Sequence, residues 1–206
     1  GSYYAASAND KVQRSKLTED VTADICVVGS GFTGLSSALH LAEKGFKVVV
    51  VEGSRIGFGA SGRNGGQLVN SYSRDMDFIE RNYGEHVSNE MGKMAFEGSQ
   101  IIKRLINDYD INCDLKPGGI FAACNNKQFD EMVQKQKLWN KHGHHETELL
   151  SSSDIQKHVG TDRYVGGLLD KSGGHIHPLN LALGEAAAFE KLGGVIYEDS
   201  TVVDIV

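Results

Sequence analysis

The stretch "CVVGSGFTGLSS", residues 26–37, constrains the fold more than any other part of the chain. It places Gly29, Gly31 and Gly34 where a short apolar run ends and a helical pattern begins. Glycine is entropically unfavourable inside regular structure, so three of them at this spacing indicate a backbone that must stay bare. The first permits a tight strand-to-helix turn, the second lets a pyrophosphate approach, and the third lets the helix pack closely against the sheet.

The residues around these glycines predict a β-strand, an α-helix and a second β-strand. The runs "DICVVG" (24–29) and "FKVVVVE" (46–52) are short and apolar, as expected of parallel strands buried on both faces. The intervening segment has a helical pattern that stops at Gly45, with its apolar positions at Leu35, Ala38, Leu39 and Ala42. Glu52 ends the second strand, about 20 residues on, where dinucleotide-binding units place the acid that binds an adenosine ribose. Together these features predict a dinucleotide site.

A second glycine-rich segment, "GSRIGFGASGRNGGQL", follows Glu52 and bears on which dinucleotide is bound. An NAD domain normally continues at once with another helix and a third parallel strand, and this chain does not. We interpret the segment as a loop that lies along a larger cofactor, which favours FAD; the alternative is a flexible surface loop. Arg55 is compatible with NADP, but Glu52 would repel a 2′-phosphate. An NAD(P)-dependent dehydrogenase domain and a non-catalytic FAD-binding subunit remain alternatives.

Charge and cysteine usage limit the partners and the compartment. The net charge is −6 without a basic tract, so nucleic acid and anionic membranes are poor partners. Residues 1–23 are polar and predict an extended arm rather than a signal peptide or an anchor, and no later run approaches the ~18 apolar residues of a spanning helix. The odd set of Cys26, Cys113 and Cys124 favours the cytoplasm, with all three expected in buried positions.

The rest of the chain predicts alternating helices and strands. Helices are expected over 87–109, around Trp139, over 151–159 and over 179–194, and strands over 118–125, around Leu168 and in 194–206. His175 and His177 alternate in an expected strand; a structural or cavity-lining role is favoured over a metal site, because no third ligand is suitably spaced. The "HGHH" run at 142–145 is interpreted as a solvated turn.

Three stretches carry a resemblance to a known family: "GSGFTGLSSALHLAEKGFKVVVVE", "GFGASGRNGGQLVNSYSRD" and "DKSGGHIHPLNLALGEA". They resemble the D-amino-acid-oxidase-type family of FAD-dependent oxidoreductases, over nearly the whole chain. The implied fold is α/β, a glutathione-reductase-type FAD-binding Rossmann domain with part of an inserted α+β substrate domain. Strands near 24–28, 47–51 and 195–198 are then expected in one parallel sheet. The expected division is an arm (1–23), a βαβ unit with the glycine-rich loop (24–84), an inserted segment (85–177) and a return to the FAD domain (178–206).

The resemblance also implies an activity. It is that of an FAD-dependent amine oxidase of putrescine utilisation, which oxidises gamma-glutamylputrescine to the aldehyde and releases ammonia and hydrogen peroxide, with the amine and oxygen as its partners. Members of this family continue well beyond residue 206, so we expect an N-terminal part of a longer oxidase. Alone, it is expected to retain little FAD, to show no turnover and to form a homodimer through open strand edges. No catalytic residue and no metal ligand is assigned.

The FAD contacts that the resemblance implies fall in four groups of residues. Arg63 has the alternative of a plain surface charge, and the two valines of the last group have the alternative of sheet core. The groups are the phosphate turn, Gly29, Gly31, Phe32, Thr33 and Gly34; the adenosine end, Glu52, Gly53, Ser54 and Arg55; the segment toward pyrophosphate, ribityl chain and flavin, Ala60, Ser61, Arg63, Asn64, Gly65, Gly66 and Gln67; and a backbone contact to adenine at Val202 or Val203.

Overall fold

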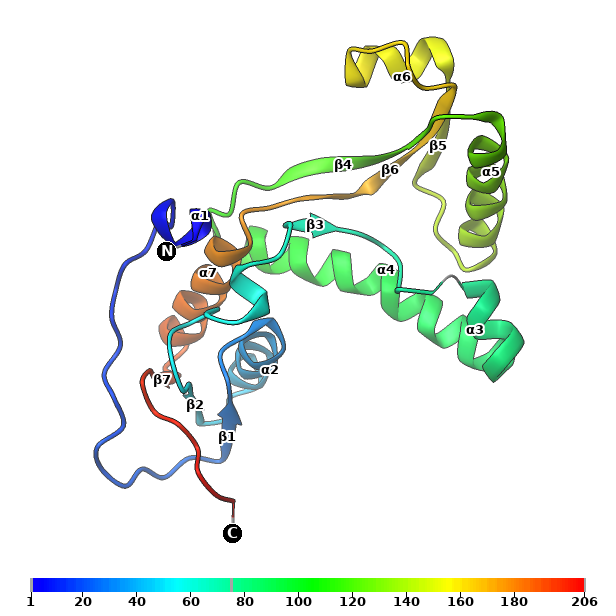
Figure 1. Ribbon diagram of the computed structural model, residues 1–206. Helices are drawn as coiled ribbons and strands as arrows, with labels where there is room; N and C mark the ends of the chain where they lie inside the picture. Colours follow the sequence, from blue (N-terminus) through cyan, green and yellow to red (C-terminus); the bar gives the residue numbers. More distant parts are fainter. Residues whose placement is uncertain (1, 75, 206) are drawn as a thin grey trace. The chain divides into compact units, whose positions relative to one another are not determined.

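The computed structural model describes residues 2–74 and 76–205, which form two compact units (Figure 1). The first unit comprises the described residues of 1–66, 104–114 and 176–206, and the second comprises those of 67–103 and 115–175. The segment 85–177, expected as an insertion, overlaps the second unit but also contains 104–114 of the first.

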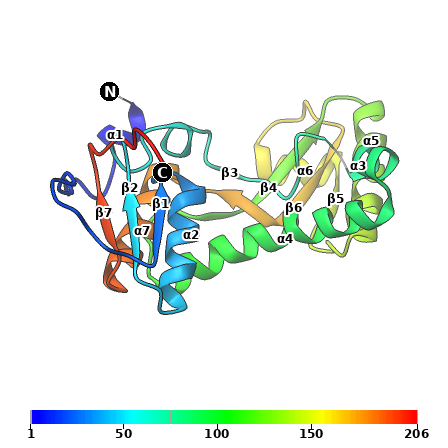
Figure 2. The same cartoon turned by 90° about the horizontal axis from the view of Figure 1, so that it is seen from below.

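A three-stranded parallel sheet forms the centre of the first unit (Figure 2). Its strands are β1 (Ile25–Val28), β2 (Val48–Val51) and β7 (Val195–Tyr197), in the order β1-β2-β7. The prediction that these three runs share one sheet is therefore confirmed. All four residues of β2 are buried, because it lies between the other two strands. β1 is half exposed and Cys26 is exposed, so the expectation of a strand buried on both faces is wrong for β1.

Two helices of the first unit pack against each other. They are α2 (Phe32–Glu43) and α7 (Pro178–Lys191), and Leu35 and Leu39 of α2 and Phe189 of α7 are fully buried. α7 begins at a proline, whose missing N–H costs nothing in the first turn, and the imidazole of His177 accepts a hydrogen bond from Asn180 N there. The N-terminal arm starts with one helical turn, α1 (Tyr3–Ala6), capped by the Ser2 hydroxyl, and a 3₁₀ turn, η1 (Ala60–Gly62), lies in the glycine-rich loop.

The second unit has an antiparallel sheet around the long strand β6. β6 pairs with three strands that lie far apart in the sequence. The strands are β3 (Gln67–Leu68), β4 (Lys116–Ala123), β5 (Thr147–Ser151) and β6 (Gly166–His175). The helices are α3 (Met76–Tyr83), α4 (Glu85–Asp108, whose last turn belongs to the first unit), α5 (Asn126–Lys141) and α6 (Ser152–Val159). Within the described ranges, no helix is both long and apolar enough to cross a membrane.

Several local expectations are corrected by the structure. His142 and His144 are buried, not solvated, because the buried Trp139 at the end of α5 draws the following turn inward. His175 ends β6 whereas His177 caps α7, so the two do not alternate in one strand. Cys113 is buried as expected, but Cys124 is exposed. Residues 198–205 contain no strand, so strand character at the end of the chain is limited to β7.

Candidate functional site

Loops of the first unit meet at the carboxyl end of the parallel sheet. The turn after β1 contacts the loop after β2, where Gly57 N donates to Ser30 O at 3.1 Å. The segment after β7 contacts the same loop, with Ser200 N donating to Glu52 O at 2.8 Å. The carboxyl end of the strands is where open α/β sheets bind their ligands. The expected phosphate and adenosine residues therefore lie together in one place.

The glycines of the first turn keep the backbone free of side chains, as a bound phosphate would need. Gly29 has a φ of +93°, which a residue with a side chain rarely adopts. A Cβ at Gly34 would lie 2.0 Å from Gly29 O, so only glycine lets α2 start this close to the turn. A Cβ at Gly31 would lie 2.9 Å from the Ser61 hydroxyl oxygen. Gly31 itself has no capping side chain, so this helix N-terminus leaves space for the pyrophosphate of a dinucleotide, although Phe32 N already donates to the Ser61 hydroxyl.

The carboxylate of Glu52 joins the first two loops. Its Oε2 accepts hydrogen bonds from Ser30 N at 2.8 Å and from the Ser30 hydroxyl at 2.9 Å, and its Oε1 accepts from Ser54 N at 2.8 Å. A carboxylate offers about four acceptor positions, so one remains for a ribose hydroxyl. This donor and acceptor pattern fits the adenosine end of FAD.

The loop from Ala60 to Gly66 is shaped by one amide side chain. Asn64 Nδ2 donates to the carbonyls of Ala60 and Ser61, and Asn64 Oδ1 accepts from Gly66 N at 2.8 Å. The Ser61 hydroxyl accepts from Phe32 N at 3.0 Å and so ties this loop to the start of α2. Asn64 and Ser61 therefore hold the loop in place against the phosphate turn.

The remaining predicted contacts are more exposed. The guanidinium of Arg63 lies 4.3 Å from the centre of the Phe58 ring, on the surface. Thr33, Gly53 and Gly65 are exposed, and Gln67 begins β3 in the second unit. Val203 is 93% exposed and lies outside any strand together with Val202, so the sheet-core alternative for these two residues is wrong.

Sequence reasoning missed two residues that the structure places in this site. Ser30 is fully buried and donates twice to Glu52. Glu198 is buried after β7, and its Oε1 accepts from Ile56 N at 2.9 Å while its Oε2 lies 3.7 Å from Arg55 Nη1. The signal that could have found Glu198 is an acidic residue directly after the last strand of the sheet, the position that Glu52 has after β2.

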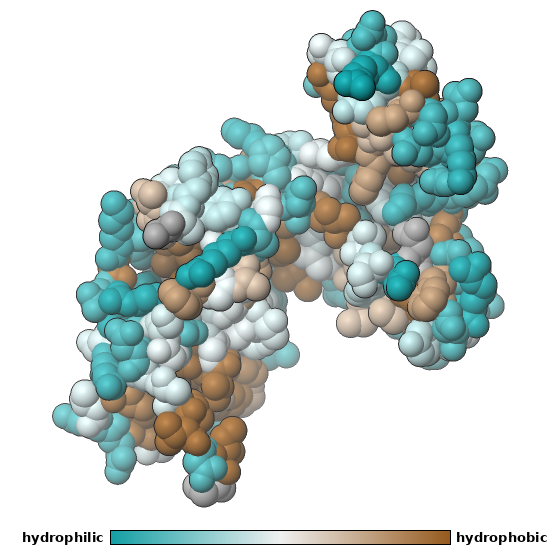
Figure 3. Space-filling model, viewed as in Figure 1, coloured by the Kyte–Doolittle hydropathy of each residue, from teal (hydrophilic) through white to brown (hydrophobic). Residues whose placement is uncertain are grey.

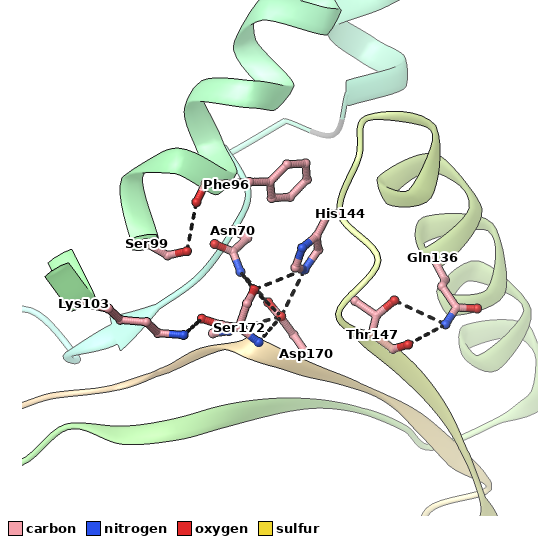
Figure 4. A network of polar contacts seen from close by, with 10 residues as sticks. Asn70, Phe96, Ser99, Lys103, Gln136, His144, Thr147, Asp170 and Ser172 are labelled. Atoms are coloured by element: carbon pink, nitrogen blue, oxygen red, sulfur yellow. Dashed lines mark hydrogen bonds and ion pairs between the residues drawn. The ribbon is translucent and has the colours of Figure 1, made fainter. Parts of the chain in front are cut away.

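The second unit contains a buried polar cluster on β6 (Figure 4). Asp170 Oδ2 accepts from Asn70 Nδ2 at 2.8 Å, while its Oδ1 lies 3.1 Å from His144 Nε2 and accepts from Ser172 N. Burial raises the pKa of Asp170, but hydrogen bonds from His144, Asn70 and Ser172 outweigh it and leave the pKa below its ordinary value. His144 and Ser172 also line a cavity of about 330 Å³. Among the described residues, no group of three side chains is arranged to hold a metal ion.

Two curated relatives resemble this chain along almost its whole length. Gamma-glutamylputrescine oxidoreductase of Escherichia coli K12 is 57% identical over 204 residues, which are 99% of this chain and 48% of that protein. The Haemophilus influenzae protein named "Probable oxidoreductase OrdL" is 44% identical over 206 residues, which are 100% of this chain and 48% of that protein. The chain thus spans about half the length of the curated relatives it matches.

Solved structures show the same fold at low sequence identity. Glycine oxidase from Geobacillus kaustophilus matches with a TM-score of 0.73 and 20% identity, over 89% of this chain and 48% of that one. L-proline dehydrogenase from P. horikoshii matches with a TM-score of 0.71 and 18% identity, over 94% of this chain and 47% of that one. The family model of DAO, the FAD dependent oxidoreductases, matches residues 24–206. The chain therefore belongs to the DAO family of FAD-dependent oxidoreductases.

Proposed function

We propose that this chain is part of an FAD-dependent amine oxidase that converts gamma-glutamylputrescine to the corresponding aldehyde. The assignment of FAD as the cofactor rests on the turn at Gly31 and Gly34, where no side chain can be accommodated, beside the Glu52 carboxylate. The substrate rests on the 57% identity to the Escherichia coli gamma-glutamylputrescine oxidoreductase. The family's dependence on FAD argues against the NAD(P)-dependent alternative.

The chain's own residues would bind and orient the cofactor. FAD, when bound, would supply the capacity to take a hydride from the carbon next to the amine nitrogen. The N-terminus of α2 would bind the pyrophosphate, Glu52 would accept a hydrogen bond from the ribose, and the loop held by Asn64 would contact the remainder of the cofactor. Over one turnover, amine, oxygen and water give aldehyde, ammonia and hydrogen peroxide in equal amounts. Val202 or Val203 would contact the adenine through backbone atoms.

The test is product formation by the full-length protein. With gamma-glutamylputrescine in air, it should release hydrogen peroxide and ammonia in a one-to-one ratio and carry FAD that can be extracted. Putrescine serves as the control, because it has the same reacting amine without the glutamyl group. FAD binding without peroxide from either amine would support the non-catalytic subunit instead.

We infer a cytoplasmic location from the thiols. Cys26 and Cys124 are exposed and, within the described residues, form no disulfide, which suits a reducing compartment. Fractionation of cells that produce the full-length protein tests this, and recovery outside the cytoplasm would contradict it.

Self-association is a further part of the proposal. β1 is an edge strand, and Val28 and Ile205 are exposed apolar residues of the first unit. Figure 3 shows apolar surface gathered at one end of this unit. Light scattering of the purified chain should show a homodimer. A monomer at micromolar concentration would contradict the proposal.

A further inference from the structure

Residues 198–200, here called the bridge, hold the N-terminal arm. Ser15 O accepts from Glu198 N at 3.2 Å, and Leu17 N donates to the Ser200 hydroxyl at 2.8 Å. Arg14 N donates to Glu198 Oε2 at 3.0 Å. Three backbone groups of the arm, within residues 14–17, therefore form hydrogen bonds with the bridge.

The same bridge holds the loop after β2 on its other side. Asp199 N donates to Ser54 O at 2.9 Å, and Ser200 N donates to Glu52 O at 2.8 Å. Ile56 N donates to Glu198 Oε1 at 2.9 Å. Asp199 has a φ of +49°, uncommon for a residue with a side chain, so the bridge turns sharply to make these contacts. The loop it holds, 52–56, is the proposed adenosine end of the FAD site.

The Glu198 carboxylate contacts both the N-terminal arm and the loop 52–56. Its side chain is only 3% exposed, and its two oxygens are divided between the arm, at Arg14 N, and the loop, at Ile56 N. Arg55 approaches the same carboxylate at 3.7 Å. A buried N–H that loses its acceptor keeps its full desolvation cost, so neither segment can leave Glu198 without a penalty.

We propose that Glu198 is a positioning residue that fixes the adenosine-binding loop and links it to the N-terminal arm. It does not touch FAD itself; it sets the backbone of 54–56 so that Glu52 and Ser54 face the ribose. This inference rests on the proposed FAD site. It goes beyond that site because it gives the arm a part in cofactor affinity.

The test is Glu198→Gln in the full-length protein, with FAD and ADP as separate ligands of the FAD-free form. ADP carries the adenosine and both phosphates of FAD but lacks the ribityl chain and the flavin. Glutamine cannot accept at both positions, so the Kd values for FAD and for ADP should rise by the same factor, about tenfold. Backbone amides of Ser54 and Ile56, and those of Arg14 and Leu17 in the arm, should exchange with deuterium faster. A merely structural role would speed exchange throughout the first unit and leave the ADP Kd unchanged.

Glu190→Gln is the matched control. Glu190 also contacts the arm, since its Oε1 accepts from Arg14 Nε at 2.8 Å. Unlike Glu198, it binds the side chain of Arg14 and not the backbone. Both Kd values should stay within about twofold of the parent, because this pair is partly exposed and makes no contact that fixes the loop.

A second measurement needs no variant. Since coupling between two sites is reciprocal, ADP bound to the parent protein should slow exchange at Arg14 N and Leu17 N. ADP that slows exchange only in 52–56, or a Glu198→Gln variant with unchanged ADP affinity, would overturn the proposal. If the parent binds neither ADP nor FAD, the proposed function fails instead.

Discussion

At the scale of single residues, the Glu52 carboxylate ties two loops and keeps one acceptor position for a ligand. Its place after β2 could be predicted, because the acid follows from the spacing of the glycines. The contacts that hold it could not, since Ser30 N and Ser54 N approach it only once the chain has folded. Local spacing thus predicts where the acidic residue lies in the chain, and folding determines which groups hold it.

Glu52→Ala should raise the Kd of the full-length protein for FAD by at least about tenfold. Loss of charge-assisted hydrogen bonds to a ribose costs roughly 1.5–3 kcal/mol. Fluorescence titration with FAD measures the change. Glu43→Gln is the control, because Glu43 pairs with Arg104 at the other end of α2. Unchanged FAD affinity in Glu52→Ala would refute the assignment.

Glu185 on α7 makes folding stability depend on pH. It is 2% exposed, its Oε2 has no hydrogen-bond partner, and burial raises its pKa from 4.5 to about 8. Between these values the unfolded chain has lost a proton that the folded chain keeps. The contribution of Glu185 to stability is therefore most favourable below pH 4.5 and becomes less favourable as the pH rises toward 8.

Glu185→Gln should remove this dependence. At pH 7 the free energy of unfolding should rise by about 3 kcal/mol relative to the parent, and the gain should shrink toward pH 4. Urea denaturation at several pH values measures it. Glu97→Gln, at an exposed position on α4, is the control and should change little. An equal gain at pH 4 and pH 7 would contradict the account.

At the scale of elements, the turn from β1 into α2 depends on one close backbone contact. Gly34→Ala places a Cβ 2.0 Å from Gly29 O, and backbone atoms cannot move aside as a flexible side chain can. We expect a loss of at least about 2 kcal/mol of stability together with weaker FAD binding. Gly59→Ala is the control, since its Cβ meets nothing within 4 Å. Thermal melts of the two variants measure the difference, and equal melting temperatures would contradict this packing.

The buried polar cluster around Asp170 contributes to the stability of the second unit. Asp170→Ala leaves the buried Asn70 and His144 without their acceptor and should cost about 3 kcal/mol at neutral pH. Because the folded pKa of Asp170 is lowered below 3.8, its contribution is present above that pH and is lost as the pH falls through the folded value. The difference in the free energy of unfolding between variant and parent, measured by urea denaturation, should therefore become smaller below pH 4. Asp162→Ala, an exposed change, should show no such difference.

The elements that could be predicted are those with a strong local pattern. The βαβ unit, α4 and α7 carry clear apolar periodicity, and their existence is confirmed. α3 and β5 were missed because they are short and mostly polar, and β5 forms only by pairing with β6. The exposure of Cys26 was likewise set by the order of the strands, which no local pattern contains.

At the scale of the whole molecule, the family and the parallel sheet follow from glycine spacing and distinctive stretches of sequence. The contacts of the N-terminal arm could not be predicted, because they join Arg14 and Leu17 to residues more than 180 positions away. Composition indicated only that the arm is polar. Its contacts with the bridge are a property of the fold.

We propose that the full-length protein uses FAD bound at this site to oxidise gamma-glutamylputrescine. The most direct measurement is the flavin absorbance of the purified protein, titrated with this amine in the absence of oxygen. The account predicts that the flavin band bleaches with one equivalent of amine per flavin and returns when air is admitted. A protein that carries FAD whose band is unchanged by the amine would contradict it.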